Sequence, residues 1–200
     1  MRGRSIVHSG IALLGAVATL VVVTGERGKA QSVRGQARVL QSTVSTVFGS
    51  TSVGLADTGT LSDSSDAREA SQGNGSVAGV FSGETLHATT IGWPDQVTSE
   101  ASVAGIALSV GGIAIGADFV MSRAFAVAAG AAGATNIEGL SIAGVPVTVT
   151  GEPNQTIVLP LGRVIVNEQR ASGGGLTVNA LHIIVSGADV VVASATAGLH

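Results

Sequence analysis

The sequence predicts an all-β fold, and three observations support this prediction. Apolar and polar residues alternate with a period of two in several segments, such as residues 37–44 and 157–161. Turn-forming residues separate these segments, for example Gly111-Gly112 and the run Gly173-Gly174-Gly175. Beyond residue 30, no window shows a helical period. Together these features indicate a single β-sandwich-like domain of short antiparallel strands, with a β-solenoid as the alternative.

The first 30 residues have the organisation of a secretory signal peptide. Arg2 and Arg4 precede an apolar run over residues 11–23, and the small residues Gly28 and Ala30 follow it. The run is shorter than the ~20 residues that span a bilayer as a helix. We therefore expect cleavage near Ala30-Gln31, which leaves residues 31–200 as a secreted, extracellular or cell-envelope domain.

The charge of the expected mature chain excludes several classes of partner. The whole chain has ten basic and 13 acidic residues; residues 1–30 hold four and one of them, so six Arg, twelve carboxylates and a net charge of −6 remain. Nucleic acids and anionic lipid surfaces bind clustered Lys and Arg, so neither is an expected partner. The chain has no Cys, which excludes disulfides. Lys29 is its only lysine, so the mature chain cannot form Lys–Asn isopeptide crosslinks.

Residues 101–134 are strongly apolar and contain only two charged residues, Asp118 and Arg123. Six glycines and the two mid-segment charges make insertion into a bilayer as a helix costly. Strand alternation, by contrast, fits the segment directly. We expect no integral membrane span in the mature chain.

An internal repeat is visible in the apolar segments. Residues 103–108, 137–142 and 178–183 match one another, and residues 83–86 are a weaker copy. Gly116-Ala117-Asp118-Phe119-Val120 similarly resembles Gly187-Ala188-Asp189-Val190-Val191. These matches predict duplicated hairpin units, and their unequal spacing favours a sandwich over a solenoid, whose coils repeat at a fixed period.

Residues 57–75 are polar and rich in Ser, Asp and Gly, which predicts a long surface loop. Asp57, Asp63 and Asp66 in this region could supply oxygen ligands to Ca²⁺, although their spacing matches no known calcium loop. A solvated acidic loop is the alternative interpretation. Ca²⁺ is the only cofactor that the sequence suggests.

The sequence does not contain a recognisable catalytic motif. His87 and His182 lie in strand-like segments, where a structural role is usual, and no Gly-x-Ser-x-Gly elbow occurs. Several carboxylates could serve a glycoside hydrolase, but the sequence alone does not bring any two of them together: Glu84, Glu100, Glu138, Glu152 and Glu168. We expect a protein that is not an enzyme.

Trp93 is the only tryptophan and is followed by Pro94, which places it in a turn. Aromatic faces stack on sugar rings, so Trp93 is a candidate ligand contact for glycans. The alternative is a ring that caps one end of the sandwich.

The motifs LADTGTL, ETLHATT, TNIEGLSIAGVPVTVTG, VLPLGRVIVNEQ and LTVNALHIIV, taken together, resemble the choice-of-anchor P family of bacterial exported proteins. The resemblance covers about residues 33–199. It implies an extracellular domain that different members attach to the cell through different C-terminal signals. It implies no catalytic or cofactor residues.

These observations predict an exported, non-enzymatic domain with a structural or interaction role in adhesion, matrix formation or self-assembly. Its expected partners are envelope or matrix proteins, or further copies of itself bound through strand edges. The alternative is a carbohydrate-binding module or a hydrolase of surface glycans. Residues 187–200 are expected to form a core strand that closes the domain, with no attachment signal after it.

Overall fold

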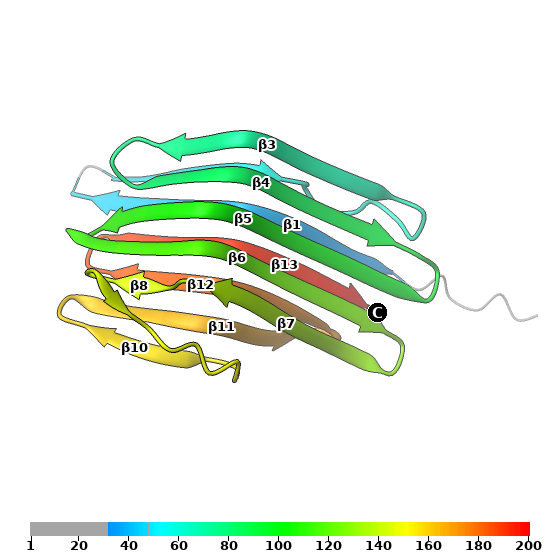
Figure 1. Cartoon of the computed structure of the whole chain (residues 1–200). Coiled ribbons are helices and arrows are strands. Elements are labelled where there is room, and N and C mark those ends of the chain that lie inside the picture. The colour runs from blue at the N-terminus through cyan, green and yellow to red at the C-terminus, as the bar shows by residue number, and fades with distance from the viewer. Residues whose placement is uncertain (1–31, 48) are drawn as a thin grey trace, which may run out of the picture. The chain divides into compact units, whose positions relative to one another are not determined.

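A computed structural model describes residues 32–47 and 49–200 as two antiparallel β-sheets packed face to face (Figure 1). The predicted signal peptide lies outside the described residues. Residues Gln31–His200 form one compact unit. The structure confirms the predicted all-β sandwich, and the described part of the chain contains no apolar helix of membrane-spanning length.

Sheet A has six strands and sheet B has seven. In spatial order, sheet A consists of β10 (Gln155–Leu159), β11 (Gly162–Ser172), β12 (Gly175–Val185), β13 (Ala188–Leu199), β1 (Val33–Thr46) and β2 (Gly49–Asp57). Sheet B consists of β3 (Ala67–Val77), β4 (Phe81–Gly92), β5 (Gln96–Val110), β6 (Ile113–Val127), β8 (Ser141–Ile142) and β9 (Val145–Pro146), with β7 (Gly130–Glu138) also paired to β6.

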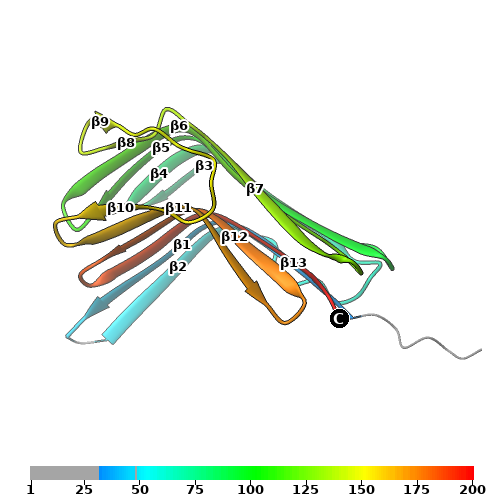
Figure 2. The ribbon, with the colours of Figure 1, turned by 90° about the horizontal axis from the view of Figure 1, so that it is seen from below.

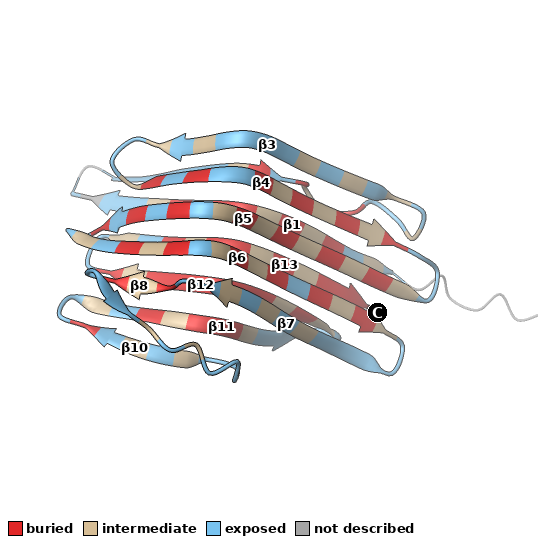
Figure 3. Ribbon diagram, viewed as in Figure 1, coloured by how far each residue is buried: buried red, intermediate tan, exposed pale blue. Residues whose placement is uncertain are grey.

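Two expectations about the strands were wrong. The strands are not short, since β5 and β6 have 15 residues each. The predicted loop over residues 57–75 is also only partly a loop: β2 ends at Asp57, β3 begins at Ala67, and residues 58–66 connect them. β3 is polar because it is the edge strand of sheet B, so only a few side chains, such as Ala70 and Val77, pack against the core (Figure 3).

The expectation that residues 187–200 contain a core strand is confirmed. β13 pairs with β12 on one side and with β1 on the other, and it also packs on β5 and β6 of sheet B. Its inward residues, including Val190, Val192 and Ala195, are fully buried.

Each sheet bends along a line that crosses its strands (Figures 1 and 2). In sheet A the line passes through Ala56, Val39, Ala193, Ala180 and Asn167, which the pairing registers skip on successive strands. Three of these residues have a left-handed backbone, with φ of 45° at Ala56 and 51° at both Ala193 and Asn167. The pairing register is the same on both sides of this line, since Arg38 pairs with Ser194 and Leu40 with Val192, so the skipped residues lie opposite one another. The left-handed residues on alternate strands turn the chain at this level, and the sheet bends there.

Sheet B bends in the same direction, with left-handed backbone at Thr85, Gly105 and Gly139. The outer face of sheet A therefore lies on the concave side of the bend (Figure 2). The bend also changes which residues point inward. Buried positions are spaced by two along a strand but by three across the bend, as at Val103 and Ile106 or at Ala117 and Val120.

This spacing explains the internal repeat. In the copies at residues 103–108 and 178–183, the first, fourth and sixth residues are buried and the bend lies between the first and the fourth. The copies at residues 83–86 and 137–142 contain the left-handed Thr85 and Gly139. Two copies do belong to hairpins, β5–β6 and β12–β13, but the motif that they share marks the bend.

The second match does not mark equivalent positions. Residues 116–120 cross the bend within β6, whereas Gly187 lies in the turn before β13 begins. The prediction that these two segments are structural copies was therefore wrong.

A substitution at Thr85 can measure the free energy that the bend costs, because Thr85 is an exposed β-branched residue with φ of 48°. Left-handed backbone costs a residue with a Cβ about 1–2 kcal/mol, and Gly avoids this cost. We expect Thr85→Gly to raise the free energy of unfolding by about 1 kcal/mol after the entropy of the unfolded chain is included. Urea denaturation measures this change.

The control is Ser82→Gly, an exposed position of the same strand β4 with ordinary strand backbone. It should lower the free energy of unfolding by about 0.5–1 kcal/mol, since Gly only adds unfolded-state entropy there. Equal destabilisation by both substitutions would contradict a strained bend.

Candidate functional site

The outer face of sheet A carries three rows of side chains that cross the strands beside the bend. Because the bend shifts the alternation, residues three apart on one strand, such as Asn179 and His182, both point outward. The first row is Gln36, Thr196, Thr177 and Arg170; the second is Asp57, Arg38, Ser194, Asn179 and Glu168; the third is Gln41, Val191 and His182.

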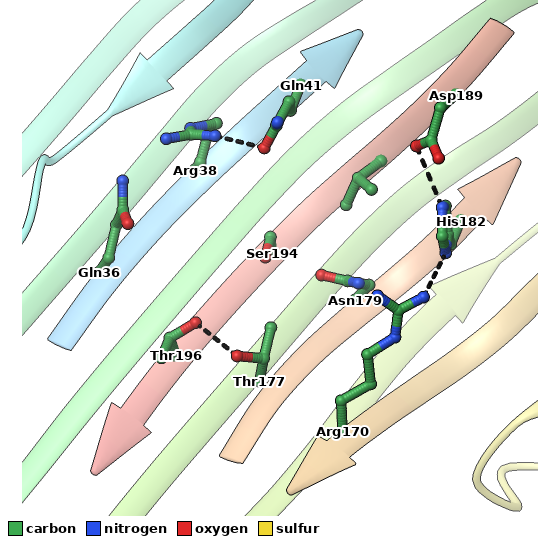
Figure 4. A pocket seen from close by; sticks show the side chains of 11 residues that line it. Gln36, Arg38, Gln41, Arg170, Thr177, Asn179, His182, Asp189, Ser194 and Thr196 are labelled. Carbon is green, nitrogen blue, oxygen red and sulfur yellow. Dashed lines mark hydrogen bonds and ion pairs between the residues drawn. The ribbon is translucent and has the colours of Figure 1, made fainter. Parts of the chain in front are cut away.

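These rows enclose a groove of about 320 Å³ on the concave face (Figure 4). Short side chains of the central strand β13, Ser194 and Thr196, lie between longer ones on both sides. Arg38 and Gln41 of β1 flank one side, and Arg170 of β11 flanks the other. The hydroxyls of Thr177 and Thr196 are 2.9 Å apart. The groove is therefore lined mainly by groups that donate and accept hydrogen bonds.

A buried polar cluster supports the Arg170 side of the groove. Glu168 and His182 are each only 4% exposed. The Glu168 carboxylate accepts hydrogen bonds from Asn179 Nδ2 at 2.7 Å, His182 Nδ1 at 2.9 Å and the Arg170 guanidinium at 2.6 Å. On its other side, His182 Nε2 lies 3.1 Å from Asp189 Oδ1. Buried polar groups must be paired in this way to avoid a large desolvation cost.

The cluster holds Glu168 in its charged form. Burial acts to raise the pKa of Glu168, but the interactions with Asn179, His182 and Arg170 outweigh burial and lower it. The carboxylate is consequently ionised at neutral pH and accepts hydrogen bonds through both oxygens.

The opposite side of the groove is organised by an ion pair. Arg38 Nε donates to Asp57 Oδ2 at 2.8 Å, and Gln36 Nε2 donates to Asp57 Oδ1 at 2.8 Å. Partial burial acts to raise the pKa of Asp57, but the hydrogen bonds from Gln36, the Gly59 backbone and Arg38 lower it. These contacts fix the Arg38 side chain at the edge of the groove, where it also donates to Gln41.

The three predicted calcium ligands do not converge. Asp57 belongs to β2 and is bonded to Arg38 beside the groove, whereas Asp63 and Asp66 lie in the connection between β2 and β3. Asp63 accepts hydrogen bonds from Ser65, and these lower its pKa. The backbone N–H of Ser62 and the Arg68 side chain lower the pKa of Asp66 to about 2. Among the residues that the structure describes, no group of three metal-ligating side chains is found.

Trp93 lies in the turn between β4 and β5, at an end of sheet B, and is 37% exposed. Its backbone N–H donates to the carbonyl of Gln96 at 2.8 Å. Trp93 does not line the groove on sheet A. A role for it in ligand contact stays a separate prediction.

Sequence reasoning missed the residues that define this site. It treated Glu168 as one of five equivalent carboxylates and His182 as a structural histidine, and Asn179 was not considered. A signal was present in Val178-Asn179-Ala180-Leu181-His182-Ile183, where two polar residues three apart interrupt an apolar strand. In a straight strand they would face opposite sides, but at a bend they face the same side.

The fold and the groove define an antiparallel β-sandwich with a hydrogen-bonding site on its bent concave face. Comparison of the chain with protein-family models, curated proteins and solved structures finds no match.

The stability of the site depends on the charge of Glu168. We expect Glu168→Gln to lower the free energy of unfolding by about 3 kcal/mol at pH 7, because it breaks a buried, hydrogen-bonded ion pair. Glu152→Gln, at an exposed position outside the cluster, is the control and should have little effect.

The difference between wild type and Glu168→Gln should also depend on pH. The pKa of Glu168 is lower in the folded than in the unfolded protein, so its stabilisation is complete above the ordinary glutamate pKa of about 4.3. It is lost as the pH falls through the folded-state value. Denaturation at pH 7, 5 and 3 measures this, and a difference that stays constant into acid would contradict the assignment.

Proposed function

We propose that this protein is an exported, non-enzymatic binding domain whose groove on sheet A holds a segment of a neutral, polyhydroxylated chain such as a glycan. The observation that carries the proposal is the set of side chains in the three rows. Arginine, asparagine, glutamine, threonine and aspartate line one concave surface. Sugars offer closely spaced hydroxyls that both donate and accept, and these side chains complement them.

The charge of the groove supports a neutral ligand over a polyanion. Arg38 is paired with Asp57, and Arg170 with Glu168. Asp189 adds a further carboxylate on the rim. A polyphosphate or nucleic acid would need an excess of cations, which this balance and the acidic mature chain do not provide.

The proposal that the protein is exported and the proposal that it is not an enzyme rest on different observations. Export rests on the signal-peptide pattern of residues 1–30 and on the resemblance to the choice-of-anchor P proteins, which is part of the proposal. A non-enzymatic role is supported by the two carboxylates that pair with the arginines lining the groove. Asp57 and Glu168 are both occupied by hydrogen bonds from neighbouring side chains, which suits a fixed binding surface.

The test is a titration of the protein with neutral polysaccharide fragments, followed by backbone amide NMR shifts. We expect shifts at Ser194, Thr196 and Thr177. Ser194→Leu places a bulky apolar side chain between the two sides of the groove and should weaken binding by at least about tenfold, which corresponds to the loss of about 1.4 kcal/mol. Ser82→Leu, on the outer face of sheet B, is the matched control and should leave binding unchanged.

Trp93→Ala distinguishes the groove from the site that Trp93 suggests. Binding through the groove should not respond to this change, because Trp93 lies outside it. If Trp93→Ala abolishes binding and Ser194→Leu has no effect, the glycan site lies at the β4–β5 turn and not in the groove. Absence of binding across neutral glycans would refute the proposed function.

A second candidate function, self-assembly through a strand edge, is favoured by β2. This strand is an edge of sheet A, and residues 49–56 contain neither charge nor proline. Edge strands are commonly protected by such residues, as β3 is by Arg68 and Glu69. Val53 on β2 is also 37% exposed. These features suit the addition of a strand from another copy of the chain.

Light scattering after size exclusion, together with electron microscopy, tests this assembly. We expect the wild-type protein to associate as its concentration rises, and Val53→Lys to remain monomeric because a charge then lies at the β2 edge. Ser76→Lys, at an exposed position of β3, is the control and should associate like wild type. A wild-type protein that stays monomeric at high concentration would refute assembly through β2.

A further inference from the structure

His182 lies between two carboxylates that come from different strands. Nδ1 is 2.9 Å from Glu168 Oε2 of β11. Nε2 is 3.1 Å from Asp189 Oδ1 of β13, a contact that Figure 4 shows. The other charged group beside the ring is Arg170 of β11, with a nitrogen 3.4 Å from Nδ1. One imidazole ring therefore joins the buried support of the groove to a residue on its rim.

The protonation state of the ring decides how many of these contacts can exist together. An imidazolium has an N–H on both nitrogens and can donate to both carboxylates, whereas a neutral imidazole has one N–H and directs a lone pair from its other nitrogen. At about 3 Å, a lone pair that faces a carboxylate oxygen is repulsive. The complete bridge from Glu168 to Asp189 thus requires the protonated ring.

The two carboxylates differ in how easily they can leave the ring. The Glu168 side chain is 5% exposed and also bonded by Asn179 and Arg170, so it has no route to water. The Asp189 side chain is 56% exposed, and water can replace its contact with His182. When the ring loses a proton, Nδ1–H stays with Glu168 and the contact with Asp189 breaks.

We propose that His182 is a proton-dependent clamp that fixes Asp189 on the rim of the groove, so that the groove binds its polyhydroxylated ligand more tightly when His182 is protonated. Asp189 held at one position offers a pre-organised acceptor to a ligand hydroxyl, and a released Asp189 must be ordered again on binding. Imidazole is the side chain whose charge changes most readily near neutral pH, which makes it suited to such a clamp. This inference rests on the proposed function for its ligand, although the clamp itself is a property of the free protein.

The first experiment follows the ring nitrogens of the free protein by ¹⁵N NMR from pH 5 to pH 8, with the His182 signals assigned by their loss in His182→Gln. We expect both nitrogens to be protonated at the acidic end and Nε2 alone to lose its proton as the pH rises. Retention of the proton on Nε2, with Nδ1 deprotonated, would overturn the clamp, since Asp189 would then stay bound.

The second experiment measures the affinity for a neutral oligosaccharide at pH 5.5 and pH 8. Wild type should bind about tenfold more weakly at pH 8, and Asp189→Asn should show no such dependence, because it has no carboxylate for the imidazolium to hold. His87→Gln is the control, since His87 lies on β4 of sheet B beside Ser71 and Glu69, and it should keep the wild-type dependence.

The outcomes separate the clamp from the proposed function. The same pH dependence in wild type and Asp189→Asn would refute the clamp while leaving glycan binding intact. If no neutral oligosaccharide binds at either pH, the proposed function fails, and the ring titration then decides alone whether the clamp exists.

Discussion

The bend across both sheets is the constraint on which the rest of the structure depends. It runs through one residue of each long strand that the pairing skips, at the same level on neighbouring strands, with left-handed backbone at Ala193 and Asn167 in sheet A and at Thr85 in sheet B. Backbone of this kind is unfavourable for residues with a Cβ. It persists because the strands on either side are fully paired and their inward residues are buried, so straightening any one strand would break the pairing of its neighbours.

The bend also accounts for the composition of the chain. Two sheets that bend together must stay close on both sides of the bend, and bulky side chains would hold them apart. A Cβ added to Gly35 would lie 2.4 Å from Thr90 Oγ1, and one added to Gly133 would lie 2.3 Å from Val178 Cγ2. The core between the sheets is built mainly from Ala, Val, Leu and Ile, in agreement with the small number of aromatic residues. Small residues here reflect the spacing of the sheets.

Sequence reasoning succeeded where a local rule decides the outcome. Alternation and turn residues identified the all-β sandwich, and the run Val190-Val191-Val192 identified a core strand. It failed where the fold overrides the local rule. The polar β3 resembled a loop because an edge strand buries few of its side chains. Residues 116–120 and 187–191 resembled structural copies because sequence alone does not show that the first segment crosses the bend and the second begins in a turn. The cluster around Glu168 depends on the pairing register of β11, β12 and β13, which the amino-acid sequence alone does not specify.

In a sheet of antiparallel strands, the alternation of apolar and polar residues does not by itself fix the register in which the strands pair. A strand that slips by two residues keeps its apolar face inward, so a straight sandwich of Ala and Val would tolerate several registers at similar free energy. Left-handed residues at a defined level remove this degeneracy, because a slipped strand would place its left-handed residue opposite regular backbone on both neighbours. The row of skipped residues therefore fixes the strand register. It selects one pairing among the several that a sequence so rich in Ala and Val would otherwise permit; its residues are Ala56, Val39, Ala193, Ala180 and Asn167.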